Sequence, residues 1–203
     1  LAAGAGSVGI GVGGSLGARC SELSTDPSVR RVQQSGAFQQ ALEAYSRLLL
    51  GPERRLPQED VDALCGQLRP ALLRTLPGVV VVDALLLRSP ESAPVTFGVT
   101  TGAVYLLTPI GTGGILDVGL SRDAWNEMIK SVGTMQLADS TSASHYACLL
   151  GSIVLQASIA ERCGFQHSVV RLADGSWLGT FHHEGWMLRF LPSGHIEEIR
   201  KGA

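Results

Sequence analysis

The segment GVVVVDALLLRS, at residues 78–89, constrains the fold more than any other part of this chain. Its apolar, mostly branched residues follow one another with only Asp83 between them, without the polar alternation of a half-exposed strand. A strand of this composition is covered on both faces by other elements. The segment VTFGVTTGAVYLL, at residues 95–107, follows the Ser89-Pro90 turn and predicts further strand with glycine at the bends. The sequence therefore predicts a buried sheet near the middle of the chain.

Amphipathic helices are predicted before this sheet. Phe38, Leu42, Tyr45 and Leu49 recur at helical spacing, which predicts a helix over about 37–50 that ends at Gly51-Pro52. A second helix begins near Pro57, where the acidic residues of its first turn favour the positive end of the helix dipole. It is broken or kinked at Pro70.

Two further helices are predicted after the sheet. Ser121 caps a short helix over RDAWNEMIKSV with Trp125, Met128 and Ile129 on one side. A longer apolar helix follows in SASHYACLLGSIVLQASIAERCG and ends at Gly164. TPIGTGGI, at residues 108–115, is predicted to be a loop, and it lacks the lysine of a phosphate-binding loop.

Residues 168–201 predict a three- or four-stranded antiparallel meander. The turn dipeptides Asp174-Gly175, Glu184-Gly185 and Ser193-Gly194 separate its alternating runs. Trp177 and Trp186 fall on facing strands and could form a cross-strand pair. The fold class is therefore α+β, an antiparallel sheet with a C-terminal β-meander packed against helices. We expect residues 1–36 to form a glycine-rich N-terminal extension and linker, and residues 37–203 to form the α+β domain.

The glycine-rich N-terminus admits three interpretations. GAGSVG, at residues 4–9, fits the spacing of a dinucleotide-binding loop, but only three residues precede it and glycines fill the helix that should follow. Gly9, Gly13 and Gly17 recur every four residues, a spacing that allows close packing of membrane helices, although the segment is only weakly hydrophobic. We expect a packing segment first, a membrane helix second and a cofactor loop third, with these three glycines as interaction residues.

Titratable residues gather most densely around His182, His183 and His195. Neighbouring side chains on a strand point to opposite faces, so His182 and His183 cannot both bind one metal ion. We expect His183 to be an exposed contact residue at a hairpin end, and we predict no metal site.

No catalytic group stands out elsewhere. Cys148 follows His145 by one helical turn, but a buried structural cysteine is the commoner case. The carboxylates of Asp83, Asp117 and Asp174 are isolated in the sequence. We therefore predict that the protein is not an enzyme and has no cofactor or catalytic residues.

Composition points to protein partners. Of the 203 residues 45% are hydrophobic and only 17% are charged, so a partner is expected to cover part of the surface. The net charge of −2 and the scattered arginines exclude a basic stripe for nucleic acid.

The cysteines and the first residue bear on the compartment. The four cysteines lie far apart without a C-x-x-C pair, which indicates neither a zinc site nor a disulfide framework and fits a reducing compartment. Removal of an organellar targeting peptide would explain a start at Leu1, so a mitochondrial location is favoured over the cytoplasm.

From residue 56 onward the chain resembles the roadblock-type dynein light chains and their longin-like relatives. Three segments carry the resemblance, namely LRTLPGVVVVDALLLRS, HYACLLGSIVLQASIAERCG and SVVRLADGSWLGTFHHEGWMLRFLPSG. An insertion over about residues 91–140 departs from that family. The resemblance implies a non-catalytic module that dimerises, or pairs with a like domain, and serves as a platform in motors, GTPase regulators or scaffolds.

The leading hypothesis is a non-catalytic structural or interaction subunit of a larger multiprotein assembly. Its partners would be other protein subunits and not nucleic acid, with membrane contact through residues 1–18 left open. One alternative is a small-molecule enzyme or nucleotide-binding protein that uses the GAGSVG loop. The other is a regulatory scaffold for a small GTPase, which follows from the family resemblance.

Overall fold

The structure is a computed structural model that describes residues 19–66, 68–69, 76, 78–84, 95–110, 119–133, 135–154, 167–182 and 185–202. In these residues the helices are α1 (Pro27–Gln33), α2 (Gly36–Leu50), α3 (Gln58–Gly66), α4 (Arg122–Val132) and α5 (Ser140–Val154). The strands are β1 (Leu68–Arg69), β2 (Val80–Ala84), β3 (Val95–Val99), β4 (Val104–Leu106), β5 (His167–Arg171), β6 (Trp177–Phe181), β7 (Trp186–Phe190) and β8 (Ile196–Lys201).

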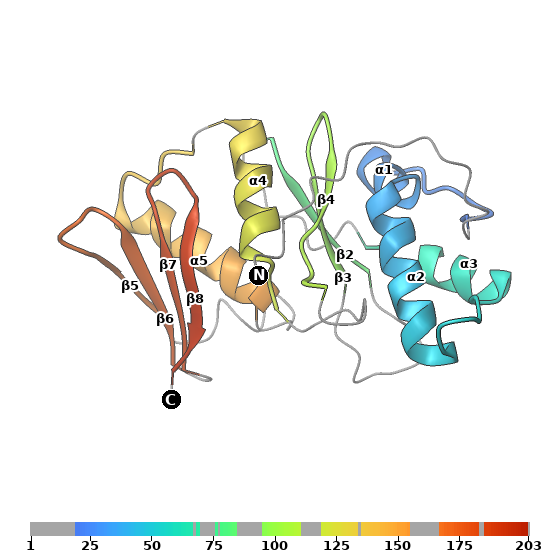
Figure 1. Cartoon of the computed structure of the whole chain (residues 1–203). Coiled ribbons are helices and arrows are strands. Elements are labelled where there is room, and N and C mark those ends of the chain that lie inside the picture. Colours follow the sequence, from blue (N-terminus) through green and yellow to red (C-terminus); the bar gives the residue numbers. More distant parts are fainter. Residues whose placement is uncertain are drawn as a thin grey trace, which may run out of the picture.

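The elements form alternating layers of helix and sheet (Figure 1). Two antiparallel sheets have the strand orders β1-β2-β3-β4 and β5-β6-β7-β8. Helices α1, α2 and α3 cover the outer side of the first sheet, while α4 and α5 lie between the two sheets. Helix α4 contacts both β4 and β8, and α5 contacts β5 and β6. The predicted α+β fold with a C-terminal meander is confirmed.

The first sheet is buried on both faces, as its sequence predicted. Val81 packs into the core formed with α4 and α5, whereas its neighbour Val82 packs into the core formed with α1, α2 and α3. Successive side chains of a strand point to opposite faces, so one strand contributes to both cores. All five residues of β3 are buried. An uninterrupted apolar run is the consequence of this double burial.

The helix starts follow from local capping. Ser35 and Ser121 accept hydrogen bonds from Phe38 N (3.1 Å) and Ala124 N (3.3 Å), which satisfies backbone donors that have no partner inside α2 and α4. Asp26 does the same for α1, with Oδ1 accepting from Ser28 N at 2.8 Å. Helix α2 ends at Gly51, whose φ of 88° is a conformation that favours glycine.

The prediction that residues 1–36 form only an extension and linker is wrong for residues 27–36. Helix α1 lies within this range, and its Val29 and Val32 are buried in the core beside α2 and β3. The helix is short and its sequence is mostly polar. Two buried valines three positions apart are too weak a periodic pattern to predict a helix from the sequence. Residues 1–18 lie outside the described residues.

Two expectations about the strands are wrong in part or in full. Of the two glycines expected at bends, Gly102 lies at the bend between β3 and β4, but Gly98 lies in the middle of β3. The side chain of Met128 fills the space where a Cβ atom of residue 98 would stand, which is the reason for glycine there. Trp177 and Trp186 are not opposite each other, since the register pairs Trp177 with Phe190 and Phe181 with Trp186. The short turn after Phe181 sets this register and places the two tryptophans at opposite ends of the hairpin. The predicted end of the long helix at Gly164 lies outside the described residues.

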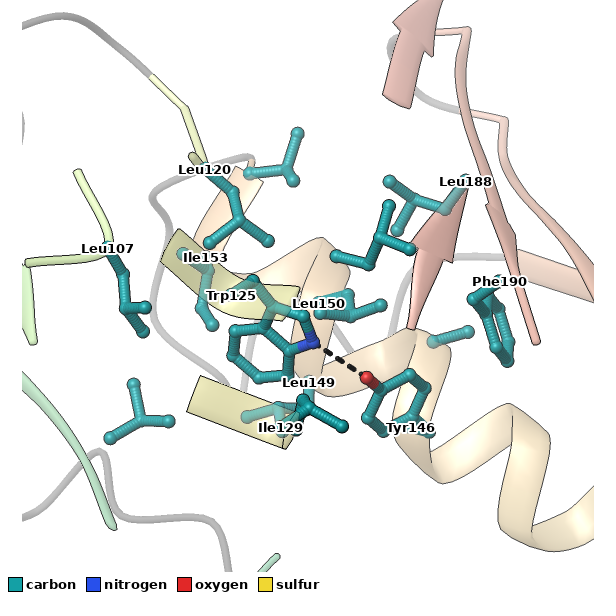
Figure 2. Close-up of a cluster of buried hydrophobic side chains, with 14 of the residues drawn as sticks. Leu107, Leu120, Trp125, Ile129, Tyr146, Leu149, Leu150, Ile153, Leu188 and Phe190 are labelled. Carbon is teal, nitrogen blue, oxygen red and sulfur yellow. Dashed lines mark hydrogen bonds between the residues drawn. The ribbon is translucent and has the colours of Figure 1, made fainter. Parts of the chain in front are cut away.

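A buried hydrogen-bonded group holds the layer of α4 and α5 to the second sheet (Figure 2). Trp125 Nε1 donates to Tyr146 Oη at 2.8 Å, and Tyr146 Oη donates to the carbonyl oxygen of Gly194 in the β7–β8 turn. Burial raises the pKa of Tyr146 above its usual value, so the hydroxyl stays protonated and remains a donor. The ring of Phe190 packs edge-on against Tyr146 with centroids 5.2 Å apart. Polar groups in this core are therefore paired as burial requires.

The absence of a disulfide framework was predicted wrongly. Cys20 and Cys65 form a disulfide with Cα atoms 5.7 Å apart, Cys148 is also disulfide-bonded, and no described cysteine is free. Cys20 meets Cys65 because the residues just before α1 lie against α3, where Asp62 Oδ1 accepts from Ser21 N at 2.8 Å and Gln58 Nε2 donates to Arg19 O at 2.6 Å. Linear spacing does not reveal such a contact between residues 45 positions apart.

We predict that Gly151→Ala destabilises the protein. A Cβ atom at this position would lie 2.2 Å from Cε1 of the buried Phe181 ring. Higher helix propensity should stabilise α5 by about 1 kcal/mol, but overpacking costs about 1–3 kcal/mol, so the clash decides the sign. Urea unfolding should show a lower free energy for this variant. Gly36→Ala is the control, because nothing lies within 4 Å of its Cβ position; equal effects of the two substitutions would contradict the packing.

We also predict that Cys20→Ala combined with Cys65→Ala lowers the free energy of unfolding by about 4 kcal/mol, the chain-entropy value for a loop of this length. Single and double variants should lose similar amounts, since either one removes the bond. Thermal unfolding followed by circular dichroism measures this loss. Unchanged melting temperatures would mean that the bond does not form.

Candidate interaction site

The C-terminal sheet has one covered face and one outer face. Residues of the covered face pack against α4 and α5 and are buried, among them Trp177, Phe181, Leu188 and Phe190. The register places the intervening residues on the other side in two rows, Val170–Leu178–Arg189–Glu198 and Ser168–Thr180–Met187–Arg200. We call these eight residues the outer face.

Apolar and charged residues divide the outer face. Its β5 and β6 half carries Val170, which is 50% exposed, and the half-buried Leu178, with Met187 adjoining them on β7. Its β7 and β8 half carries the charged side chains. Among the described residues only Leu23 and Ile110 are other large hydrophobics with comparable exposure. An exposed apolar area with a polar border is typical of a protein-binding surface.

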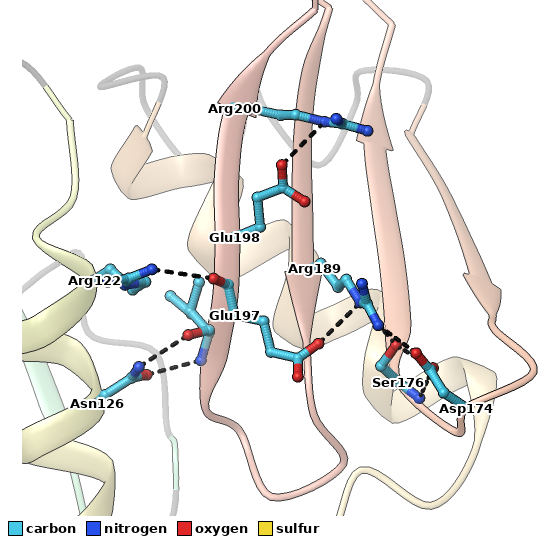
Figure 3. Close-up of polar contacts among 9 residues, drawn as sticks. Arg122, Asn126, Asp174, Ser176, Arg189, Glu197, Glu198 and Arg200 are labelled. Carbon is cyan, nitrogen blue, oxygen red and sulfur yellow. Dashed lines mark hydrogen bonds and ion pairs between the residues drawn. The ribbon is translucent and has the colours of Figure 1, made fainter.

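The charged half is a network centred on Arg189 (Figure 3). Arg189 Nε lies 2.9 Å from Glu197 Oε2 and 3.1 Å from Ser176 Oγ, and its Nη2 pairs with the carboxylate of Asp174. The other Asp174 oxygen accepts from Ser176 N at 3.0 Å and from Ser176 Oγ at 2.6 Å. The sequence had indicated that Asp174 is isolated, but the structure places its carboxylate in this network.

Hydrogen bonds favour the ionised form of the Asp174 carboxylate. Those from Ser176 lower the pKa of Asp174 most, and the charge of Arg189 lowers it further. A general acid or base near neutral pH needs a carboxyl pKa raised towards 7, which is the opposite shift. The network therefore serves charge pairing and surface shape better than proton transfer.

Helix α4 closes one edge of the sheet. Asn126 accepts from Ile196 N (2.8 Å) and donates to Ile196 O (2.9 Å), as a neighbouring strand would do. Arg122 Nη1 donates to Glu197 O at 3.3 Å. Glu197 is the extra residue at an irregularity of the β7–β8 register. The backbone edge of β8 is thus occupied at its start by side chains of α4, which protects it from pairing with another strand.

Those histidines and carboxylates singled out in the sequence that the structure describes do not lie together. His182 is exposed, and the ring of His195 lies 3.2 Å from Ser193 Oγ. Asp83 Oδ1 accepts from Thr96 Oγ1 at 2.8 Å on the first sheet. The predicted interaction residues Gly9, Gly13, Gly17 and His183, together with Glu184 and Asp117, lie outside the described residues.

Cys148 is not a free nucleophile, because it is buried and disulfide-bonded, while His145 is exposed. No group of three or more metal-binding side chains occurs in the described part of the chain. A hollow of about 410 Å³ lies between α2 and residues 52–56, and one of about 430 Å³ lies beside the start of α4. Arginine and acidic side chains both line each hollow. Neither hollow therefore has the uniform charge that would attract an ionic ligand.

Comparisons with known proteins add no relative. No family model matches the chain, and neither does any curated protein or solved structure. Within the described residues, no helix has the length and apolar character needed to cross a membrane.

The outer face was only partly visible in the sequence. Alternation in WLGTF and WMLRF separated the buried residues of β6 and β7 from the others. The ion pairs of Arg189 depend on the folding of the β5–β6 turn and of the register irregularity, which no linear pattern reveals.

We predict that Asp174→Asn weakens the acid dependence of stability. A carboxyl whose pKa is lowered on folding stabilises the folded state above its unfolded pKa, about 3.9, and this contribution is lost as pH falls through the lower folded pKa. The free energy of unfolding, measured by urea titration between about pH 5 and pH 2, should fall less steeply in the variant. Ser176→Ala should reduce the slope in part, because the backbone donor remains. Identical slopes in all three proteins would contradict this role.

Proposed function

We propose that this chain is a non-catalytic interaction subunit of a multiprotein assembly and that it binds a partner protein through the outer face. The observation that carries the proposal is the open face of the C-terminal sheet, where Val170, Leu178 and Met187 adjoin a border of ion-paired side chains. Both faces of the first sheet are covered by helices, so the outer face is the sheet surface available to a partner.

The chemistry of the described residues supports a binding role. Arg189 pairs with both Asp174 and Glu197, and these ion pairs fix the shape of the border. Rigid, prearranged surfaces lose less conformational entropy when they bind. The apolar residues beside this border would contribute burial, and a partner that covers them would relieve their exposure to water.

The alternative functions stay predictions. The GAGSVG segment of the nucleotide-binding hypothesis lies outside the described residues, as do most residues of the TPIGTGGI loop. The roadblock-like resemblance implies a scaffold for a small GTPase, and this hypothesis also makes the chain a binding platform. A meander packed on helices is compatible with them, but no described contact singles them out.

The disulfide between Cys20 and Cys65 bears on the compartment. Disulfides persist in oxidising compartments and are rare in the cytosol, so we propose that the chain works where thiols are oxidised. The preference for mitochondrion over cytoplasm stays a prediction, as does membrane contact through residues 1–18.

We predict that Val170→Asp releases the chain from its assembly. A tagged chain would be expressed in its source and isolated in mild detergent, and its native mass and co-purifying chains would be determined. The unmodified chain should appear in a large complex of defined composition, and Val170→Asp should shift it to the mass of the free chain because a buried unpaired carboxylate opposes binding.

Ile110→Asp is the matched control, since Ile110 is similarly exposed (41% against 50%) but follows β4 in the chain and is not part of the outer face. It should leave the complex intact. A chain that is isolated without partners, or two variants that behave alike, would refute the proposal.

A further inference from the structure

The two edges of the C-terminal sheet differ. The β8 edge is occupied at its start by Asn126 and Arg122 of α4, and its sequence IEEIRK is charged. The β5 edge has the sequence HSVVR, without the proline, lysine or acidic residues that protect many edge strands. In the sheet order, β5 has β6 as its neighbour on one side and no described strand on the other.

Hydrogen bonding at the β5–β6 turn shows which backbone groups face outward. Leu172 N donates to Ser176 O at 2.8 Å, and hydrogen-bonded residues alternate along an antiparallel ladder. Val170 and Ser168 therefore bond to β6, whereas the N–H and C=O groups of Val169 and Arg171 point away from it. In the described part of the chain nothing donates to, or accepts from, these outward groups. They form a template for one more strand.

The side chains around this edge indicate the chemistry of the added strand. Val170 is 50% exposed on the outer face, so the residue beside it should be apolar. Arg171 projects on the other face, where its Cζ atom lies 5.5 Å from the centre of the Trp177 ring. In the described part of the chain its guanidinium takes part in no ion pair. Neither β5 nor β6 has an acidic residue. A carboxylate opposite Arg171 would therefore complement its charge.

We propose that the β5 edge binds an extended segment of a partner protein that pairs with the backbone of Val169 and Arg171 as an added strand. The segment has an acidic residue opposite Arg171 and an apolar residue opposite Val170. Backbone hydrogen bonds supply affinity in this mode of recognition, and alternate side chains supply specificity. This inference rests on the proposed function and names the kind of partner.

A second copy of this chain fits the edge less well. Antiparallel pairing of two β5 strands about Val169 would set Arg171 of each against His167 of the other, and would bring no carboxylate to either arginine. Charge complementarity thus favours a different, acidic chain.

The test uses a displayed library of random nine-residue peptides, selected against the full chain. Enriched peptides should share an acidic residue next to an apolar one, and the best of them would be synthesised with a fluorescent label. Anisotropy should show binding at least tenfold weaker for Val169→Pro, which removes an outward N–H but none of the β5–β6 ladder. Arg171→Glu should weaken binding similarly, and a peptide with arginine in place of its acidic residue should restore it.

Arg200→Glu is the control, because Arg200 lies on the outer face but pairs with Glu198 at the far edge. It should change peptide affinity by less than twofold. Circular dichroism would confirm that each variant is folded, and the charge exchange at Arg171 decides the test if Val169→Pro does not fold.

Several results would overturn the inference. These are the absence of enriched peptides, binding that is insensitive to both substitutions, and a dimer of the full chain that Val169→Pro abolishes, which would assign the edge to a second copy. Val170→Asp could release the chain from its assembly while Val169→Pro and Arg171→Glu leave the assembly intact. In that case the proposed function stands, but the partner does not bind through the β5 edge. If the chain has no partners at all, the proposed function fails first.

Discussion

The burial of β2 and β3 on both faces is the constraint on which the rest of the structure depends. Val81 and Val82 are neighbours in the sequence but belong to different cores, one with α4 and α5 and one with α1, α2 and α3. This double burial requires helices on both sides of the first sheet. The second sheet then covers α4 and α5 from their other side, and its own far side is left as the outer face.

The layer of α4 and α5 also determines what the second sheet can bind. Gly151 of α5 lets the Phe181 ring approach the helix backbone, and Tyr146 anchors the β7–β8 turn through Gly194. On α4, Asn126 takes the place of a neighbouring strand beside β8. One of the helices that bury one face of the sheet therefore also occupies the start of one of its edges. The outcome is an asymmetric sheet whose apolar surface lies on the β5 side, together with backbone groups that have no partner among the described residues.

The sequence predicted what depends on local signals. Caps such as Ser121 and stops such as Gly51 define their helices within one turn of chain, and the valines of β2 indicate their double burial directly. Pairings between distant residues were predicted wrongly or missed, namely the Cys20–Cys65 disulfide, the partners of Trp177 and Trp186, and the ion pairs of Asp174. Alternation predicted which residues of β6 share a face. Whether that face is open depends on where α4 and α5 pack, which the strand alone does not encode.

Hydrogen exchange tests the central claim, binding through the outer face, most directly. The amide exchange of the chain would be measured by mass spectrometry in its native assembly and again after its release as the free chain. The account predicts that slowing on assembly is concentrated in β5, β6 and β7, at residues 167–181 and 186–190, with little change in α1, α2 and α3. Slowing confined to those helices, or an identical exchange pattern in the two states, would contradict it.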